Sequence, residues 1–108
     1  MDRALAVGID VGTSGVRAVA MDANGTVQAQ ASAAMADFGS DARDPAAWWA
    51  ATQQALTTML GATDPSRVAA LAVDGTSGTL LAIDGSGAPV SSGRMYNDAV
   101  ADPAILAS

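Results

Sequence analysis

A glycine-rich string between two apolar runs constrains the fold of this chain more than any other feature. Residues 8–18 read Gly-Ile-Asp-Val-Gly-Thr-Ser-Gly-Val-Arg-Ala, with apolar runs at 4–11 and 16–21 on either side. Two glycines within four residues favour a tight reversal of the chain, so the sequence predicts a hairpin here. The string Gly-Thr-Ser-Gly recurs at 75–78 after a third apolar run. The repeat is open to three interpretations: two phosphate loops, two hairpin turns, or a coincidence among small residues.

The residues that follow predict more antiparallel structure. Asp-Ala-Asn-Gly at 22–25 is typical of a second hairpin, because Asn and Gly tolerate positive φ. Residues 26–35 then alternate between apolar and polar side chains, as a half-buried strand does. We therefore expect three consecutive antiparallel strands. The almost continuous apolar run at 4–11 predicts a strand that is covered on both faces.

A helix is predicted next. Asp44-Pro45 is a strong helix start, with Asp as the N-cap, and Gly61 is expected to end the helix. A buried strand is predicted at 68–73 and a further strand at 79–83, followed by a turn at 84–87. Asp-Pro at 102–103 repeats the helix start, so we expect a second, incomplete helix there and infer a fragment of a longer protein. The predicted buried face of the first helix consists of Trp48, Thr52, Ala55, Leu56, Met59 and Leu60.

Composition points to a thin core. Alanine supplies 26 of the 54 hydrophobic residues, and Leu, Ile, Val and Phe together number only 20. Alanine buries little apolar area, and buried area is the main stabilising term. We expect a marginal domain or a part of something larger.

Charge and missing residue types exclude several functions. The net charge of −6 comes from eleven Asp and five Arg, with no Glu, Lys, His or Cys. An acidic chain without a basic cluster argues against nucleic-acid binding. The absence of Lys excludes a Walker A or Schiff-base lysine, and the absence of His and Cys excludes the usual zinc sites. No apolar run approaches about 20 residues, so we expect no membrane segment or signal peptide and a cytoplasmic location.

The first glycine-rich string has the chemistry of a phosphate loop. Gly12 permits close backbone approach, Thr13 and Ser14 offer hydroxyl groups, and Arg17 can neutralise charge. Asp10, at the end of a predicted buried strand, is placed to hold Mg²⁺ directly or through water. The alternative is an ordinary turn with an Asp at the strand end, and the short motif by itself leaves both open.

Four motifs in order resemble the FGGY family of carbohydrate kinases. Residues 8–18 match the family's first phosphate loop, and Asp-Pro-Ala-Ala-Trp-Trp at 44–49 is similar to a helix opening that recurs in it. Residues 68–84 resemble the sugar-side strand–loop–strand, and Met-Tyr-Asn-Asp at 95–98 stands where the family often has Trp-x-Asp. The resemblance implies an α/β, ribonuclease-H-like (actin-like ATPase) mixed sheet: three antiparallel strands, a helix and further strands. Residues 1–108 would be the first part of the N-terminal kinase domain, an incomplete domain.

The resemblance also implies a reaction, its cofactors and its site residues. The expected activity is transfer of the ATP γ-phosphoryl group to a sugar hydroxyl, with ATP and Mg²⁺ and a catalytic base beyond residue 108, so the fragment alone should be inactive. The second string departs from the Gln-Met-His of xylulose kinases and is most like D-ribulose kinases, which favours a ketopentose. The implied ATP phosphate-binding residues are Gly12, Thr13, Ser14 and Arg17; the metal residue is Asp10; the sugar residues are Thr76, Ser77, Tyr96 and Asp98.

Structural interpretations stand beside these roles. The second string can be a turn without a ligand, and Tyr96 can pack in the core. Trp48 and Trp49 are expected to close the helix against the sheet, and Met21, Met35 and Met59 to fill the core. Two alternative functions also remain: another actin-like ATPase of the chaperone or activator type, or a non-enzymatic domain that self-associates, for instance as a homodimer, through an exposed sheet edge.

Overall fold

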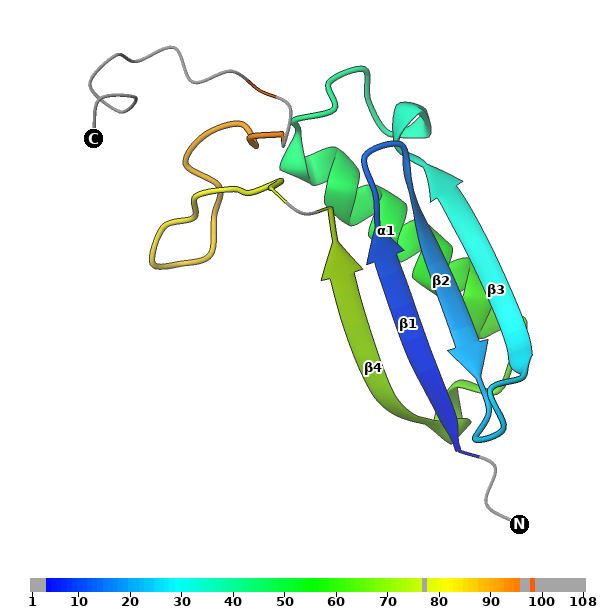
Figure 1. The fold of residues 1–108 in the computed structure, drawn as a ribbon. Helices are drawn as coiled ribbons and strands as arrows, with labels where there is room; N and C mark the ends of the chain where they lie inside the picture. Colours follow the sequence, from blue (N-terminus) through cyan, green and yellow to red (C-terminus); the bar gives the residue numbers. More distant parts are fainter. Residues whose placement is uncertain (1–3, 77, 96–97, 99–108) are drawn as a thin grey trace.

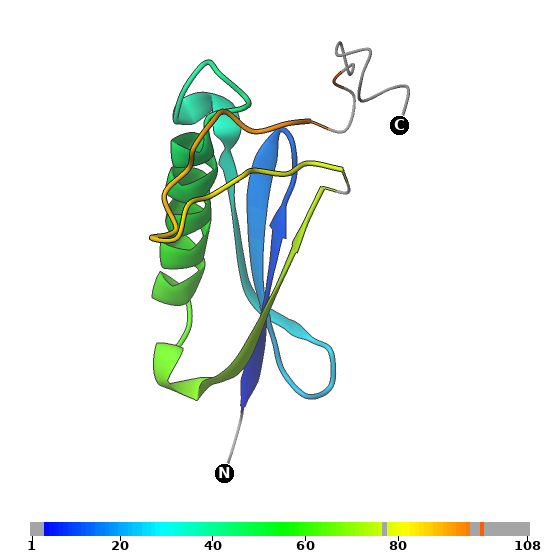
Figure 2. The same cartoon turned by 90° about the vertical axis from the view of Figure 1, so that its left-hand side faces the viewer.

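A computed structural model of the chain describes residues 4–76, 78–95 and 98, and shows a mixed sheet with one helix on one of its faces (Figures 1 and 2). The strand order is β3-β2-β1-β4. Neighbouring strands β1, β2 and β3 are antiparallel, whereas β4 runs parallel to β1. The predicted α/β mixed sheet is confirmed. The strands are β1 (Leu5–Val11), β2 (Gly15–Met21), β3 (Val27–Ala34) and β4 (Val68–Gly75).

Both predicted hairpins form. In the first, the Gly12 amide donates to the Gly15 carbonyl at 2.9 Å. In the second, Gly25 has a φ of 80°, a value that favours glycine. The Asp22 carboxylate accepts hydrogen bonds from the backbone amides of Asn24 and Thr26, at 2.9 and 3.0 Å. Local turn chemistry therefore fixes the antiparallel part of the sheet.

Helix α1 (Pro45–Gly61) begins as predicted but presents a slightly different face. The Asp44 carboxylate accepts a hydrogen bond from the Ala46 amide at 2.9 Å, which makes Asp44 the N-cap. Gly61 is the last helical residue, and Ala62 rather than a glycine caps the helix. The buried face lies about one residue earlier in the sequence than the predicted face. Trp48, Leu56 and Leu60 of the predicted face lie at the edge of the core and are only partly buried. The fully buried stripe is Ala47, Ala51, Ala55 and Met59.

The core is a layer of small side chains between α1 and one face of the sheet. Ala18 and Ala20 of β2 and Ala51 and Ala55 of α1 have no exposed surface, which lets the helix backbone come close to the sheet. Larger side chains complete the core cluster. They are Leu5, Val7, Ile9, Val16, Met35 and Met59.

The face of the sheet opposite α1 is open in the part of the chain that the structure describes. Ala6, Gly8 and Asp10 of β1 are exposed there, so the prediction that β1 is covered on both faces is wrong for this chain. Met21 is also exposed, whereas Met35 and Met59 are buried as expected. The single helix covers only one face of the sheet. The prediction failed because small residues such as Ala6 and Gly8 extend the apolar run although they lie on the open face.

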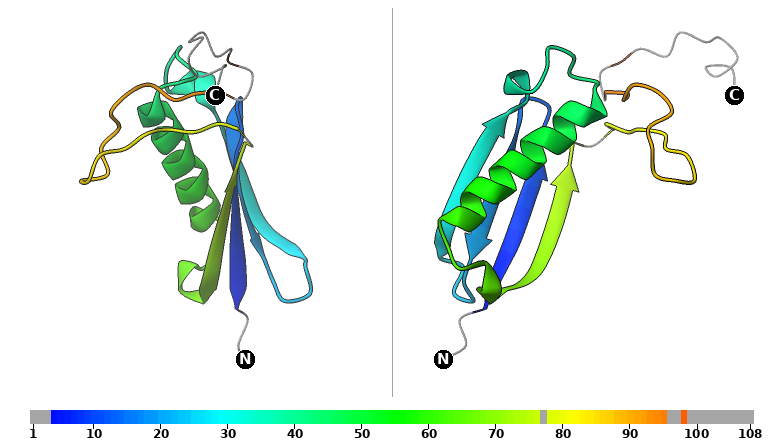
Figure 3. Two further views of the ribbon diagram at one scale, coloured as in Figure 1. Left: turned by 60° about the vertical axis from the view of Figure 1, so that its left-hand side comes forward. Right: turned by 180° about the vertical axis from the view of Figure 1, so that it is seen from behind.

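Strand β4 is not buried as the sequence predicted. Leu71 and Val73 pair with the buried Val7 and Ile9 of β1, yet they are 52% and 59% exposed. Helix α1 packs mainly on β2 and β3, and it crosses the back of the sheet obliquely (Figure 3). The apolar side of β4 is therefore left beyond the reach of α1.

The predicted strand at 79–83 is absent. The chain leaves the sheet after β4 and forms an irregular hairpin, with isolated bridges from Leu80 to Arg94 and from Ile83 to Pro89 (Figure 1). Its tip is the predicted turn at 84–87, in which Gly87 has a φ of 88°. The second predicted helix lies outside the described residues. Among the residues that are described, no helix has the length and hydropathy needed to cross a membrane.

The two copies of Gly-Thr-Ser-Gly need their last glycine for different reasons. A Cβ atom on Gly15 would lie 2.7 Å from the Ala33 carbonyl oxygen of β3, so this position requires glycine for close approach. Gly78 has a φ of 79°, in the left-handed region. The repeat is thus one string in two different backbone settings, and only the first copy joins two strands.

We predict that Gly15→Ala destabilises the chain by about 1–3 kcal/mol, because the added methyl group meets a backbone carbonyl that cannot rotate away. The matched control is Gly8→Ala in β1, where a Cβ atom would have no neighbour within 4 Å. We expect the control to keep or raise stability by up to about 1 kcal/mol. Urea unfolding followed by circular dichroism measures both. Equal stabilities of the two variants would contradict the close approach.

Candidate functional site

The loops that follow β1 and β4 lie against each other. Because these strands are parallel neighbours, their carboxyl ends meet at one edge of the sheet, the edge at which α/β proteins usually bind ligands. The backbone amide of Thr76 donates to the Val11 carbonyl at 3.1 Å, which joins the loops just beyond the strands. The N-terminal end of α1 lies at the same edge (Figure 3). The two glycine-rich strings therefore form one site.

Three charged side chains gather on the open face of the sheet just before this edge. Asp10 pairs in register with Arg17 of β2 on one side and with Asp74 of β4 on the other. A hydrogen bond with Asp10 and the negative charge of that residue raise the pKa of the Asp74 carboxyl, with a contribution from burial. All three residues line a shallow hollow of about 290 Å³. Two carboxylates side by side make this hollow attractive to a cation.

The donor set fits a magnesium ion that brings ligands of its own. No group of three or more acidic side chains that could enclose a metal occurs among the described residues. Magnesium commonly binds proteins through one or two carboxylates and completes its shell with water and substrate phosphates. Asp10 and Asp74 can supply that number of carboxylates. The pair suits a metal–phosphate complex better than a structural metal held by protein alone.

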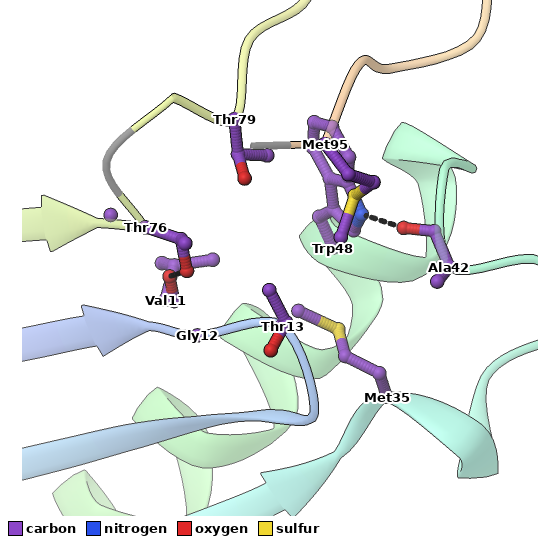
Figure 4. Close-up of a pocket in the computed structure, with 10 residues that line it drawn as sticks. Val11, Gly12, Thr13, Met35, Ala42, Trp48, Thr76, Thr79 and Met95 are labelled. Atoms are coloured by element: carbon purple, nitrogen blue, oxygen red, sulfur yellow. Dashed lines mark hydrogen bonds between the residues drawn. The ribbon is translucent and has the colours of Figure 1, made fainter. Parts of the chain in front are cut away.

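On the side of the sheet that faces α1, the same edge contains a pocket of about 190 Å³ (Figure 4). Trp48, Met35 and Met95 lie together on one side of it, and Val11 and Thr76 lie on the other. The polar part of the lining consists of threonines, of which Thr79 has a buried Oγ1 without a hydrogen-bond partner among the described residues. The pocket therefore combines an apolar wall with hydroxyl groups, one of which is free to bond a ligand.

Trp48 builds the apolar wall from the first turn of α1. Its indole Nε1 donates to the Ala42 carbonyl at 2.8 Å, which fixes the ring. Trp48 packs against the core as expected and also lines the pocket, a role that the sequence analysis did not assign. The expectation for Trp49 is wrong: its side chain is 64% exposed, because it points away from the stripe that α1 buries.

Asp98 is held by Arg43, the residue before the N-cap of α1, and also contacts the backbone of Met95, which lines the pocket. Arg43 Nε donates to Asp98 Oδ2 at 3.0 Å, and Nη2 donates to Oδ1, so the contact is bidentate. The hydrogen bond from Arg43, together with one from the Met95 amide, lowers the pKa of Asp98 to about 2. The carboxylate is therefore fully ionised at neutral pH.

The predicted site residues separate into two groups. Asp10 and Arg17 lie on the open face, whereas Gly12 and Thr13 line the pocket with Thr76. Ser14 is exposed at the hairpin tip and lines neither hollow. Ser77 and Tyr96 lie outside the described residues. The roles of all these residues stay predictions, but the structure places Asp10, Thr13 and Thr76 at one edge.

Besides Trp48, sequence reasoning missed Asp74, Arg43, Thr79 and Met95 in this region. Asp74 was detectable, because it precedes the second glycine-rich string much as Asp10 precedes the first. The positions of Arg43, Thr79 and Met95 depend on how the segment after β4 folds back onto α1. No local sequence pattern indicates that return.

Comparison with known proteins shows the family of this chain. Residues 5–104 match the N-terminal domain of the FGGY family of carbohydrate kinases. The chain belongs to the FGGY family. The match confirms the resemblance seen in the motifs. Members of this family are phosphotransferases that use ATP. The match also favours a carbohydrate kinase over a chaperone-type or activator-type ATPase.

Solved structures of FGGY-like kinases have the same fold. A xylulose kinase from Bifidobacterium adolescentis is 28% identical, with a TM-score of 0.75 over 89% of this chain. A xyloylose kinase from Brucella ovis (22% identity, TM-score 0.74, 87% of this chain) and a gluconate kinase from Lactobacillus acidophilus (19%, 0.68, 84%) agree in fold. The chain spans 18%, 21% and 19% of the lengths of these three proteins, respectively.

We predict that Asp74→Asn stabilises the chain in metal-free buffer, and increasingly so as the pH rises. The raised pKa of Asp74 means that the folded state favours the protonated carboxyl. That contribution is complete below the ordinary pKa of about 3.9 and is lost as the pH rises through the folded-state value. The neutral Asn side chain loses nothing over this range.

Thermal unfolding in EDTA from pH 3.5 to pH 8 measures the effect. The difference in melting temperature between variant and parent should grow with pH, and Asp10→Asn, which removes the other member of the pair, should behave alike. A difference that does not change with pH would argue against interacting carboxylates.

Proposed function

We propose that this chain forms the first part of the N-terminal domain of an ATP-dependent sugar kinase that phosphorylates a ketopentose in the cytoplasm. One observation carries the proposal: the loops after two adjacent parallel strands are hydrogen-bonded to each other at one edge of the sheet. Paired carboxylates lie on one face of the sheet at this edge, and a pocket lined by threonines lies on the other. Phosphoryl transfer needs a charged site for phosphates and a separate site for the acceptor at short distance. The charged hollow and the threonine-lined pocket at this edge are proposed to serve as these two sites.

The phosphate end of the reaction is assigned to the first hairpin. Asp10 is proposed to hold Mg²⁺, with Asp74 beside it as a second carboxylate. Gly12, Thr13 and Ser14 would offer backbone amides and hydroxyl groups to the phosphates, and Arg17 a positive charge. When bound, the metal neutralises charge on the transferred group. The chain's own part would be to place one cation and two anions on the open face of the sheet, at the edge that also carries the glycine-rich turn.

The sugar end is assigned to the pocket beneath the second loop. A sugar presents apolar C–H faces and a rim of hydroxyl groups, which suits a pocket with Trp48 on one wall and Thr76 and Thr79 on another. Ser77 and Tyr96 are proposed sugar contacts from the motif resemblance, and Asp98 a hydroxyl acceptor at the rim. The ketopentose is favoured because a xylulose kinase is among the similar structures and because the small second string resembles that of D-ribulose kinases.

The catalytic base is proposed to lie in the remainder of the enzyme. The chain spans about a fifth of the similar kinases, and none of its eleven aspartates matches the base of the family. The adenine pocket and a second phosphate loop would also come from that remainder. The present residues would bind, orient and neutralise, but would not remove the proton of the sugar hydroxyl.

We predict that the full-length protein containing this chain releases ADP in a sugar-dependent manner, and that Asp10→Ala lowers kcat by at least about 100-fold through loss of charge stabilisation. Asp37→Ala, an exposed aspartate after β3, is the matched control and should retain activity. Coupled ADP assays with D-ribulose, D-xylulose, gluconate and glycerol measure both. Near-normal turnover by Asp10→Ala would rule out the metal role.

A second prediction concerns residues 1–108 alone. This chain should show no ATP-dependent phosphorylation of any sugar in the panel, because half of the nucleotide cleft and the base are proposed to lie elsewhere. The same coupled assay, run at high protein concentration, measures it. Sugar-dependent ADP release by the isolated chain would show that the division of labour proposed here is incorrect.

A non-enzymatic, self-associating domain is the second candidate. The exposed apolar side of β4, with Leu71 and Val73, favours it, since exposed strand edges pair readily with other chains. Sedimentation velocity together with an ATP titration of the full-length protein separates the two. Assembly without nucleotide binding would favour this candidate over the kinase.

A further inference from the structure

The segment after the irregular hairpin is fastened to the start of α1 by one residue, Arg43. Its backbone carbonyl accepts a hydrogen bond from the Gly93 amide at 2.8 Å, and its guanidinium binds Asp98 through two nitrogens. The same residue thus contacts both Gly93 and Asp98 from a position just before the Asp44 N-cap. Between these two contacts, Arg94 pairs with Leu80 through two backbone hydrogen bonds of 2.8 and 2.9 Å, which ties the segment back to the irregular hairpin.

These contacts of Arg43 also hold the segment against two residues that line the pocket, Met95 and Trp48. Met95 lies between the two anchored positions and lines the pocket. Gly93 lies so close to Trp48 that a Cβ atom on the glycine would be 2.2 Å from the indole Cη2. A shift of the segment would therefore displace Met95 and open a gap beside Trp48.

The Asp98 carboxylate is nearly saturated by its protein partners. Oδ2 accepts from Arg43 Nε and from the Met95 amide, each at 3.0 Å, and Oδ1 accepts from Arg43 Nη2. A carboxylate has about four acceptor positions, so one position on Oδ1 has no partner among the described residues. A bidentate guanidinium contact fixes the plane of the carboxylate and hence the direction of that free position.

We propose that Arg43 is a positioning residue that orients Asp98 and closes the apolar wall of the pocket around the sugar. The inference rests on the proposed function, because it assumes that the pocket receives a sugar and that Asp98 accepts a hydrogen bond from one of its hydroxyl groups. Arg43 acts through geometry rather than charge state: an Asp carboxyl with its ordinary pKa of about 3.9 is ionised at neutral pH without help. Arginine is required because lysine, a point charge, cannot make the two parallel contacts.

The test uses steady-state kinetics of the full-length protein with the sugar of the panel that it phosphorylates best. Arg43→Gln should raise the KM for that sugar by about tenfold and leave the KM for ATP within about twofold, because only the sugar contacts lose their orientation. Arg43→Lys should lie between Arg43→Gln and the parent. Arg94→Gln is the matched control. It also removes one positive charge near Asp98 but leaves the bidentate Arg43–Asp98 contact in place, so it should behave like the parent.

A double-mutant cycle distinguishes positioning from general destabilisation. If Arg43 acts through Asp98, Arg43→Gln combined with Asp98→Asn should have the same sugar KM as Asp98→Asn alone. A sugar KM that Arg43→Gln leaves unchanged, or an equal rise in both KM values, would overturn the proposal. Should Arg43→Gln fail to fold, an unchanged sugar KM in Arg43→Lys would overturn it as well. Absence of sugar phosphorylation in the parent would overturn the proposed function, and this inference with it.

Discussion

The parallel pairing of β1 with β4 is the interaction on which the rest of the site depends. It is the only pairing in the described sheet between strands far apart in the sequence, and it brings Asp10 beside Asp74. The Thr76–Val11 hydrogen bond extends the same alignment past the strand ends. Parallel neighbours end at the same edge, so both loops and the start of α1 meet there. Without this pairing the carboxylates, the threonines and Trp48 would have no common location.

The antiparallel hairpins and the helix start were predictable because local chemistry determines them. Asp22 and Gly25 make the second hairpin through contacts within a few residues, and Asp44 caps α1 through a bond to Ala46. The helix face was less accurate, since Ala47 and Ala51 carry no strong hydrophobic signal and yet form the centre of the stripe. How closely the helix and sheet backbones approach determines which alanines are buried, and a hydrophobicity pattern gives no information about that distance.

Longer-range features could not be read from the sequence. The burial of β4 was misjudged because an apolar strand looks the same whether or not a helix reaches it. The strand expected at 79–83 gave way to a looser hairpin that returns to Arg43. For the site, the motif resemblance predicted roles for Asp10, Thr13, Thr76 and Asp98. It did not predict Arg43 and Thr79, whose positions depend on the segment that returns to α1. Contacts that depend on a loop's path are decided by tertiary structure.

The two glycine-rich strings are identical in letters but are subject to different limits on change. At Gly78 the backbone lies in the left-handed region, where Asn and Asp are tolerated better than other residues that have a Cβ atom. At Gly15 the limit is the carbonyl of β3, which no side chain of any type avoids. Under the proposed function, the second string is therefore free to acquire polar side chains that would face a different sugar, while the first stays fixed by the architecture of the sheet. Substrate choice could then change without disturbing the first hairpin.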